Sequence, residues 1–131
     1  MSASIAQAGA VVFAKNLPTM ARFYRELLGM AVLHSEADHV VLEGAGIQLV
    51  IHAIPKRIAA QIVIADPPVA RDETPIKLFF AVTSLADARV RAASLGGRLA
   101  PPGKQWSARG FTACDGVDPE GNMLQLRQTG P

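Results

Sequence analysis

The stretch AVVFAKNLPTMARFYRELLGMAVL, residues 10–33, contains the pattern that decides the fold. Its first part, residues 10–15, is short, apolar and partly β-branched, which is typical of a strand. Asn16 suits the N-cap of a following helix, Pro18 its first turn and Gly29 its end. Apolar side chains recur at helical spacing on one face, at Met20, Phe23, Tyr24, Leu27 and Leu28. The stretch therefore predicts a strand followed by an amphipathic helix.

The unit continues with three short strand-like runs that complete a β-α-β-β-β order, at residues 31–35, 39–42 and 47–53. The same order returns in the second half of the chain, at residues 75–82, 85–95, 98–100, 108–115 and 122–128. Leu17 falls on Leu85 and Gly29 on Gly97 at one common offset. The shared order predicts an internal repeat, and the alternative is a chance recurrence of short β-α patterns.

We expect one domain, because a chain of 131 residues can bury only a modest core. The two β-α-β-β-β units put this domain in the α+β class. The domain covers residues 1–131, with module one at residues 9–54 and module two at residues 75–128. Residues 55–74 are rich in proline, alanine and charge, and they are predicted to form the linker.

Composition and charge exclude several kinds of partner. The chain is 50% hydrophobic and 18% charged, and its net charge is only +2, without a run of lysine or arginine. Nucleic-acid binding is therefore not expected. No apolar run reaches the roughly 18 residues of a membrane span, so no membrane partner is expected. The single cysteine, Cys114, suits a reducing cytoplasm and favours a cytoplasmic location.

Three motifs carry a resemblance to a known superfamily: NLPTMARFYRELLGM (residues 16–30), IKLFFAVTSLADA (76–88) and DPEGNMLQL (118–126). With these motifs the chain resembles the vicinal oxygen chelate superfamily, which includes glyoxalase I, bleomycin-resistance proteins, fosfomycin-resistance enzymes and extradiol dioxygenases. The resemblance covers residues 9–128. It implies two βαβββ modules whose curved mixed sheets surround a cleft, and it implies a homodimer.

In the metal-using members of the superfamily, four inward side chains, usually His or Gln and Glu, bind a divalent metal. The resemblance puts these places at Gly9, Gln48, Lys77 and Gln125. Gly9 offers no side chain, the Lys77 ammonium repels a cation, and the glutamines offer only neutral oxygens. We therefore expect no metal and no cofactor at these places. Metal-dependent glyoxalase I or dioxygenase chemistry is not expected either.

Other potential metal ligands lie elsewhere in module one. The run HSEADH, residues 34–39, contains His34 and His39, and we expect it to form an exposed polar turn. His52 is expected in the core or on the surface. The sequence leaves open whether His34, His39 or His52 binds a metal at another place.

The same replacements favour a cleft that binds a small neutral or anionic molecule. The amides of Gln48 and Gln125 and the ammonium of Lys77 can pair with a carboxylate, a phosphate or a polarised carbonyl. Strand alternation and loop position add the ligand-binding candidates Phe13, Phe79, Trp106 and Arg109. The alternatives are buried glutamines tied to backbone, a lysine that snorkels to solvent, aromatic rings in the core and a solvated arginine.

Two classes of function follow. The leading hypothesis is a metal-independent binder of a small molecule, which resembles the antibiotic-sequestering and resistance proteins of the superfamily. Bleomycin itself is disfavoured, because it is cationic and this chain is slightly basic. The alternative is an enzyme of the lyase, isomerase or dioxygenase type that acts without a metal or with a displaced metal site. The sequence leaves the ligand and any catalysis open.

Overall fold

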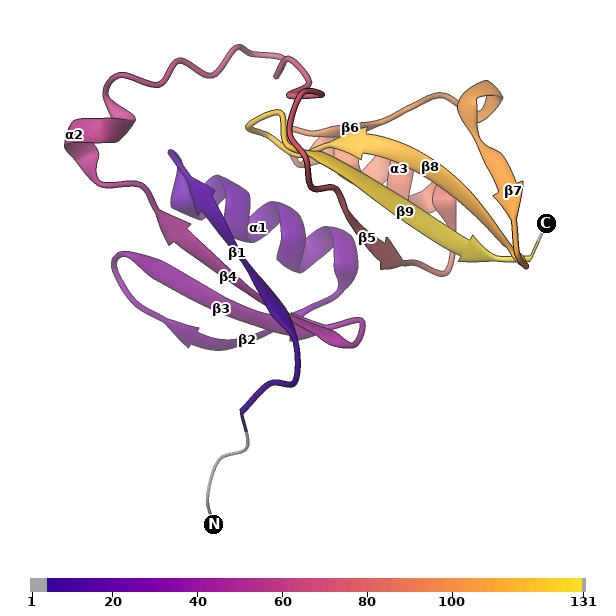
Figure 1. The fold of residues 1–131 in the computed structure, drawn as a ribbon, viewed down its shortest axis with the longest axis horizontal. Coiled ribbons are helices and arrows are strands. Elements are labelled where there is room, and N and C mark those ends of the chain that lie inside the picture. The colour runs from indigo at the N-terminus through magenta and orange to yellow at the C-terminus, as the bar shows by residue number, and fades with distance from the viewer. Residues whose placement is uncertain (1–4, 131) are drawn as a thin grey trace.

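The structure, a computed structural model, describes residues 5–130, so residues 1–4 and 131 of the expected domain lie outside it. Module one contains the elements β1 (Gly9–Ala14), α1 (Leu17–Leu28), β2 (Ala31–Ser35), β3 (His39–Gly44) and β4 (Ile47–Ala53). Its sheet has the order β1-β4-β3-β2, and β1 runs parallel to β4 (Figure 1).

Module two has the matching sheet order β5-β9-β8-β6, and a short strand, β7, also pairs with β8. Its elements are β5 (Leu78–Ala81), α3 (Leu85–Ser94), β6 (Arg98–Leu99), a short 3-10 helix (Pro102–Lys104), β7 (Trp106–Ala108), β8 (Phe111–Val117) and β9 (Met123–Thr129). A four-residue helix, α2 (Lys56–Ala59), lies between the modules. The strand expected over residues 108–115 was wrong at its start, because Arg109 and Gly110 have positive φ and turn the chain from β7 into β8.

The helix boundaries follow the local signals in the sequence. The Asn16 side chain accepts a hydrogen bond from the backbone N–H of Thr19 at 3.2 Å, and Gly29 ends α1 with a φ of 64°. Ser84 caps α3 in the same way. The predicted caps are confirmed. Within residues 5–130, no helix has the length and apolar character needed to cross a membrane.

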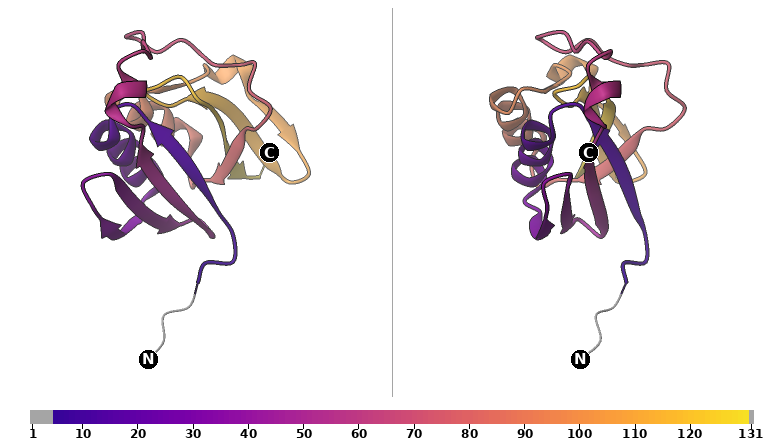
Figure 2. Two further views of the ribbon diagram at one scale, coloured as in Figure 1. Left: turned by 60° about the vertical axis from the view of Figure 1, so that its left-hand side comes forward. Right: turned by 90° about the vertical axis from the view of Figure 1, so that its left-hand side faces the viewer.

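The helices α1 and α3 lie on the same side of the two sheets, as the two views of Figure 2 show. The core fills the space between helices and sheets and runs through both modules. Its fully buried large side chains include Met20, Phe23, Leu27, Leu42, Leu49, Ile51, Leu85, Leu124 and Leu126. We call the side of each sheet that faces the helices the helix face, and the opposite side the open face.

The turn formed by Asp118–Asn122, which we call the DPEGN turn, joins the two modules. The Glu120 carboxylate accepts hydrogen bonds from the backbone N–H groups of Lys15, at 2.8 Å, and Asn16, at 2.7 Å. The hydroxyl of Tyr24 donates to the buried Asp118 carboxylate at 2.7 Å. The turn that enters the last strand of module two therefore holds the start of the first helix of module one.

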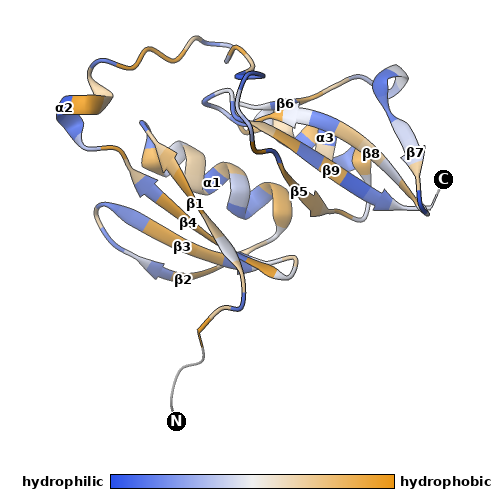
Figure 3. Cartoon of the chain, viewed as in Figure 1, coloured by the Kyte–Doolittle hydropathy of each residue, from blue (hydrophilic) through white to orange (hydrophobic). Residues whose placement is uncertain are grey.

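The open faces carry exposed apolar side chains. Val11 and Phe13 on β1 are 55% and 61% exposed, while Phe79 on β5 and Trp106 on β7 are 57% and 41% exposed. In Figure 3 the strands of module one are largely hydrophobic, whereas β9 turns hydrophilic in its second half. Both open faces therefore combine exposed apolar side chains with polar ones.

Candidate functional site

Candidate side chains of module two meet because of the register of its strands. Gln125 of β9 pairs with Phe79 of β5 on one side and with Asp115 of β8 on the other. Paired residues of neighbouring strands point to the same face of a sheet. Lys77 lies two residues before Phe79, so it reaches the same open face, as the alternation in the sequence predicts.

Four polar side chains connect there, and we call Lys77, Asp115, Gln125 and Arg127 the open-face network. The Lys77 ammonium lies 3.1 Å and 3.2 Å from the two carboxylate oxygens of Asp115. The Gln125 amide donates to Asp115 at 3.4 Å and accepts from the Arg127 guanidinium at 2.7 Å. Gln125 is only 8% exposed, yet these contacts tie it to side chains rather than to the backbone.

Aromatic rings hold the guanidinium groups of this face. The Arg127 guanidinium lies 3.6 Å from the centroid of the Phe79 ring and 4.4 Å from that of Phe111. Arg109 lies 5.2 Å from the Phe111 ring. Trp106 pairs with Ala113 of β8, so it belongs to the same face at its outer edge. Cation–π contacts restrict both arginines and leave their planar N–H groups available to acceptors.

The charges of this surface are unequal. Lys77, Arg109 and Arg127 bring three positive groups to this surface, and the Asp115 carboxylate pairs with Lys77. The Lys77 and Asp115 side chains remain 38% and 33% exposed, so solvent or a ligand can reach the pair. An excess of fixed donors and positive charge is the chemistry that recognises carboxylates and phosphates.

The other two predicted ligand-binding residues lie in module one. Gln48 pairs with Gly9 of β1 and donates to the Glu43 carboxylate at 3.4 Å. It borders an open hollow of about 460 Å³ on that module. Phe13 lies four residues after Gly9 on β1, and the centroid of its ring is 6.0 Å from that of the His52 ring. The seven predicted residues therefore divide between the two open faces, with five of them on module two.

The residues at the superfamily's metal positions do not fit a metal. A Cβ atom at Gly9 would lie 2.5 Å from the backbone oxygen of Gln48, so position 9 has no room for a ligand side chain without a backbone shift. The Lys77 ammonium and the Asp115 carboxylate already satisfy each other. Gln48 and Gln125 add only neutral amides.

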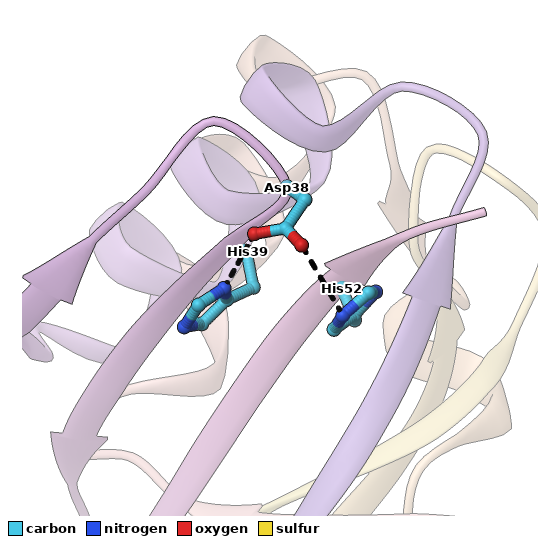
Figure 4. Close-up of side chains that lie close together, drawn as sticks. All are labelled: Asp38, His39 and His52. Atoms are coloured by element: carbon cyan, nitrogen blue, oxygen red, sulfur yellow. Dashed lines mark hydrogen bonds and ion pairs between the residues drawn. The ribbon is translucent and has the colours of Figure 1, made fainter. Parts of the chain in front are cut away.

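A separate cluster of potential ligands lies on the open face of module one (Figure 4). One oxygen of the Asp38 carboxylate lies 2.8 Å from Nδ1 of His39, and the other lies 3.9 Å from Nε2 of His52. The hydrogen bond with His39 holds the pKa of the Asp38 carboxyl below its usual value. His34 is near, but it pairs with Glu36 at 3.0 Å. The two ends of the HSEADH run belong to strands, because His34 lies in β2 and His39 begins β3.

Sequence reasoning missed two members of the open-face network. Arg127 has the same alternation as Gln125, so the pattern along β9 was a signal for it. Asp115 could be found only from the pairing of β8 with β9, which the sequence does not reveal. Phe111 contacts both arginines and begins β8, three residues after the predicted start of that strand at residue 108.

The two βαβββ modules and the match to a glyoxalase-like domain place the chain in the vicinal oxygen chelate superfamily. Within this class, the chain belongs to the family of glyoxalase-like domains, which matches it over residues 9–127. Comparison of the sequence with curated proteins finds no significant match.

Solved structures support the same fold. A glyoxalase/bleomycin resistance protein/dioxygenase family enzyme from Burkholderia phytofirmans PsJN has a TM-score of 0.66 and 15% identity, covering 93% of this chain and 97% of that one. The genomically encoded fosfomycin resistance protein of Listeria monocytogenes has a TM-score of 0.65 and 14% identity, covering 98% and 94%. A bleomycin-binding protein in complex with bleomycin has a TM-score of 0.58 and 23% identity, covering 94% and 98%.

Proposed function

We propose that the chain binds a small neutral or anionic molecule on the open face of module two, without a metal, as a sequestering or resistance protein. The observation that carries this proposal is the placement of Arg127. Its guanidinium donates a hydrogen bond to Gln125 and lies over the rings of Phe79 and Phe111. A buried amide, a restrained guanidinium and flat apolar surface together suit a ligand with a ring and an acidic or carbonyl group.

The charge of the surface selects among ligands. Lys77 shares its charge with Asp115, so Arg109 and Arg127 remain as the excess cations. A cationic ligand would meet repulsion from both, whereas a carboxylate or phosphate would replace water at their N–H groups. This argues against a bleomycin-like cation, although a bleomycin-binding protein has the same fold.

The homodimer that the superfamily resemblance implies is part of the proposal. Val11, Phe13, Phe79 and Trp106 expose apolar surface on the open faces. A second copy that covers part of these faces would remove this surface from water and enclose the ligand. Sedimentation at micromolar concentration should give twice the chain mass of 13.8 kDa. A cytoplasmic location, inferred from the single cysteine, can be checked with a tagged chain.

The test begins with a thermal-shift screen of small anionic and neutral metabolites and antibiotics, run with and without EDTA. The affinity of the best ligand is then measured for Lys77→Met and Arg127→Met. A hydrogen bond to a charged group contributes about 1.5–3 kcal/mol, so each variant should bind roughly 10- to 100-fold more weakly. Lys56→Met removes an exposed lysine of α2 and serves as the matched control.

EDTA should leave the ligand affinity unchanged. The proposal is overturned if the ligand requires a metal, or if both network variants bind it as well as the parent chain and the Lys56→Met control do. Equal binding by cationic analogues would remove the preference for anionic and neutral ligands.

One observation favours the alternative, an enzyme with a displaced metal site. It is the convergence of Asp38, His39 and His52 on the open face of module one. Turnover of a ligand found in the screen, abolished by chelation and restored by a divalent metal, would support this second function.

A further inference from the structure

We propose that Asp38, His39 and His52 form a binding site for one divalent transition-metal ion of the zinc class. The site lies on module one, and the inference is independent of the ligand proposed for module two. The three side chains offer one carboxylate oxygen and two imidazole nitrogens, all within 4.8 Å of one another.

The distances agree with a shared ion. Zinc binds nitrogen and oxygen at about 2.0–2.2 Å, so its ligand atoms stand roughly 3.3 Å apart in a tetrahedral site. The Asp38 carboxylate lies 2.8 Å from His39 and 3.9 Å from His52, on either side of that spacing. Figure 4 shows the carboxylate between the two rings, with one oxygen directed to each. The two rings lie parallel, so binding one ion requires them to turn from this stacked arrangement until both nitrogens face the ion.

The hydrogen bonding of His52 prepares the correct nitrogen. Its Nδ1 lies 2.9 Å from the backbone oxygen of Ala53, and a carbonyl oxygen can only accept. Nδ1 therefore carries a proton, and Nε2, 3.9 Å from an Asp38 carboxylate oxygen, is the nitrogen that can bind an ion. A backbone carbonyl that accepts from the other ring nitrogen is the usual arrangement behind a metal-bound histidine.

His39 and Asp38 hold a proton where the ion would sit. Nδ1 of His39 and a carboxylate oxygen of Asp38 share a hydrogen bond of 2.8 Å. An imidazole that binds an ion through Nδ1 carries its proton on Nε2, so the ion takes the place of the hydrogen in this bond. The hydrogen bond therefore holds the two ligand atoms next to each other.

The backbone that carries the three ligands is ordered by paired strands. His39 of β3 is the direct partner of His52 of β4, and their rings stack at 5.8 Å with an interplanar angle of 10°. The N–H of Ala53 donates to the backbone oxygen of Asp38 at 2.8 Å, and the N–H of Glu36 donates to that of His39 at 2.8 Å. Ligands on such a scaffold lose little conformational entropy when they bind an ion.

The ligand set selects the kind of ion. Imidazole and carboxylate suit zinc, nickel, cobalt or iron(II), whereas magnesium and calcium prefer oxygen alone. Three protein ligands leave coordination positions open on the open face, beside the exposed ring of Phe13. The site differs from the superfamily position, because His52 lies four residues, about 13 Å, beyond Gln48 on β4.

The test is titration of the full, untagged chain with zinc, and with cobalt(II) for its visible spectrum. The chain has three histidines, so the comparison is complete. We expect one ion per chain, with an affinity at least 100-fold weaker in His39→Gln, His52→Gln and Asp38→Asn. His34→Gln is the matched control, because His34 pairs with Glu36, and it should bind as the parent does.

Circular dichroism and thermal melting of each metal-free variant show whether it folds as the parent chain does. The proposal is overturned if the folded parent chain binds zinc more weakly than a micromolar dissociation constant. It is also overturned if the folded His52→Gln variant binds zinc as tightly as the parent chain does. It is overturned too if His34→Gln loses as much affinity as His39→Gln, since the ion would then be held by the HSEADH run alone. Ligand binding by Lys77 and Arg127 variants is measured separately, so either proposal can fail alone.

Discussion

Replacing Glu120 with alanine tests whether the DPEGN turn holds the two modules together. The Glu120 side chain is 6% exposed, and its two carboxylate oxygens accept from the backbone N–H groups of Lys15 and Asn16. These amides lie at the junction of β1 and α1, more than a hundred residues away in the chain. Glu120→Ala removes both acceptors and leaves the rest of the turn in place.

The expected loss of stability follows from these two bonds. A hydrogen bond to a charged group contributes about 1.5–3 kcal/mol, which gives roughly 3–6 kcal/mol for the pair. Two effects reduce this sum. The variant no longer buries a charged carboxylate, and water can reach the backbone of the exposed residues Lys15 and Asn16. We expect a net loss of about 3 kcal/mol in the free energy of unfolding. For a domain of this size the melting temperature should fall by about 10 °C.

Urea denaturation measures the free energy, and amide hydrogen exchange at Lys15 and Asn16 reports on the two bonds directly. Both amides should exchange faster in Glu120→Ala. Glu26→Ala is the control, because Glu26 forms a surface pair with Arg22 one helical turn away and should lose no more than about 0.5 kcal/mol. A loss in Glu120→Ala as small as in this control, with unchanged exchange at both amides, would refute the reasoning.

Three further predictions concern the fold. Tyr24→Phe removes the hydroxyl that donates to buried Asp118. Urea denaturation should show that the free energy of unfolding falls by about 2 kcal/mol. Gly97→Ala puts a Cβ against the Val117 backbone oxygen and the Phe23 ring, and calorimetry should show a loss of about 1–3 kcal/mol. Burial raises the pKa of the Asp118 carboxyl above its usual value. The folded state therefore keeps a proton on Asp118 up to a higher pH than the unfolded state does. The stability that this proton contributes is present at low pH and is lost as pH rises through the folded pKa. Asp118→Asn should remove this dependence of the free energy of unfolding on pH. An unchanged pH dependence in the variant would contradict the prediction.

Local signals explain why much of the fold could be predicted. The caps at Asn16 and Gly29 act within a few residues, and the apolar face of α1 repeats at helical spacing. The alternation of Lys77 with Phe79 also follows from chain geometry alone, and so does that of Gln125 with Arg127. These features need no knowledge of which strands pair.

Features that depend on strand pairing were not accessible in the same way. Asp115 meets Lys77 and Gln125 only because β8, β9 and β5 lie in one register. His39 and His52 become neighbours through the pairing of β3 with β4, so the sequence could describe HSEADH only as a polar turn. A slip of one residue in either register would turn these side chains to the helix face.

By itself, the sequence determined the order of the main elements and the ends of the helices, because residue identity and short-range geometry decide these. The tertiary structure alone decided that the predicted ligand-binding residues divide between two open faces. It also decided that Arg127 completes the network of Lys77 and Gln125, and that Asp38 joins two histidines. The physical reason is that hydrogen bonds between strands set side-chain neighbours that are distant in the chain, and no local pattern encodes that register.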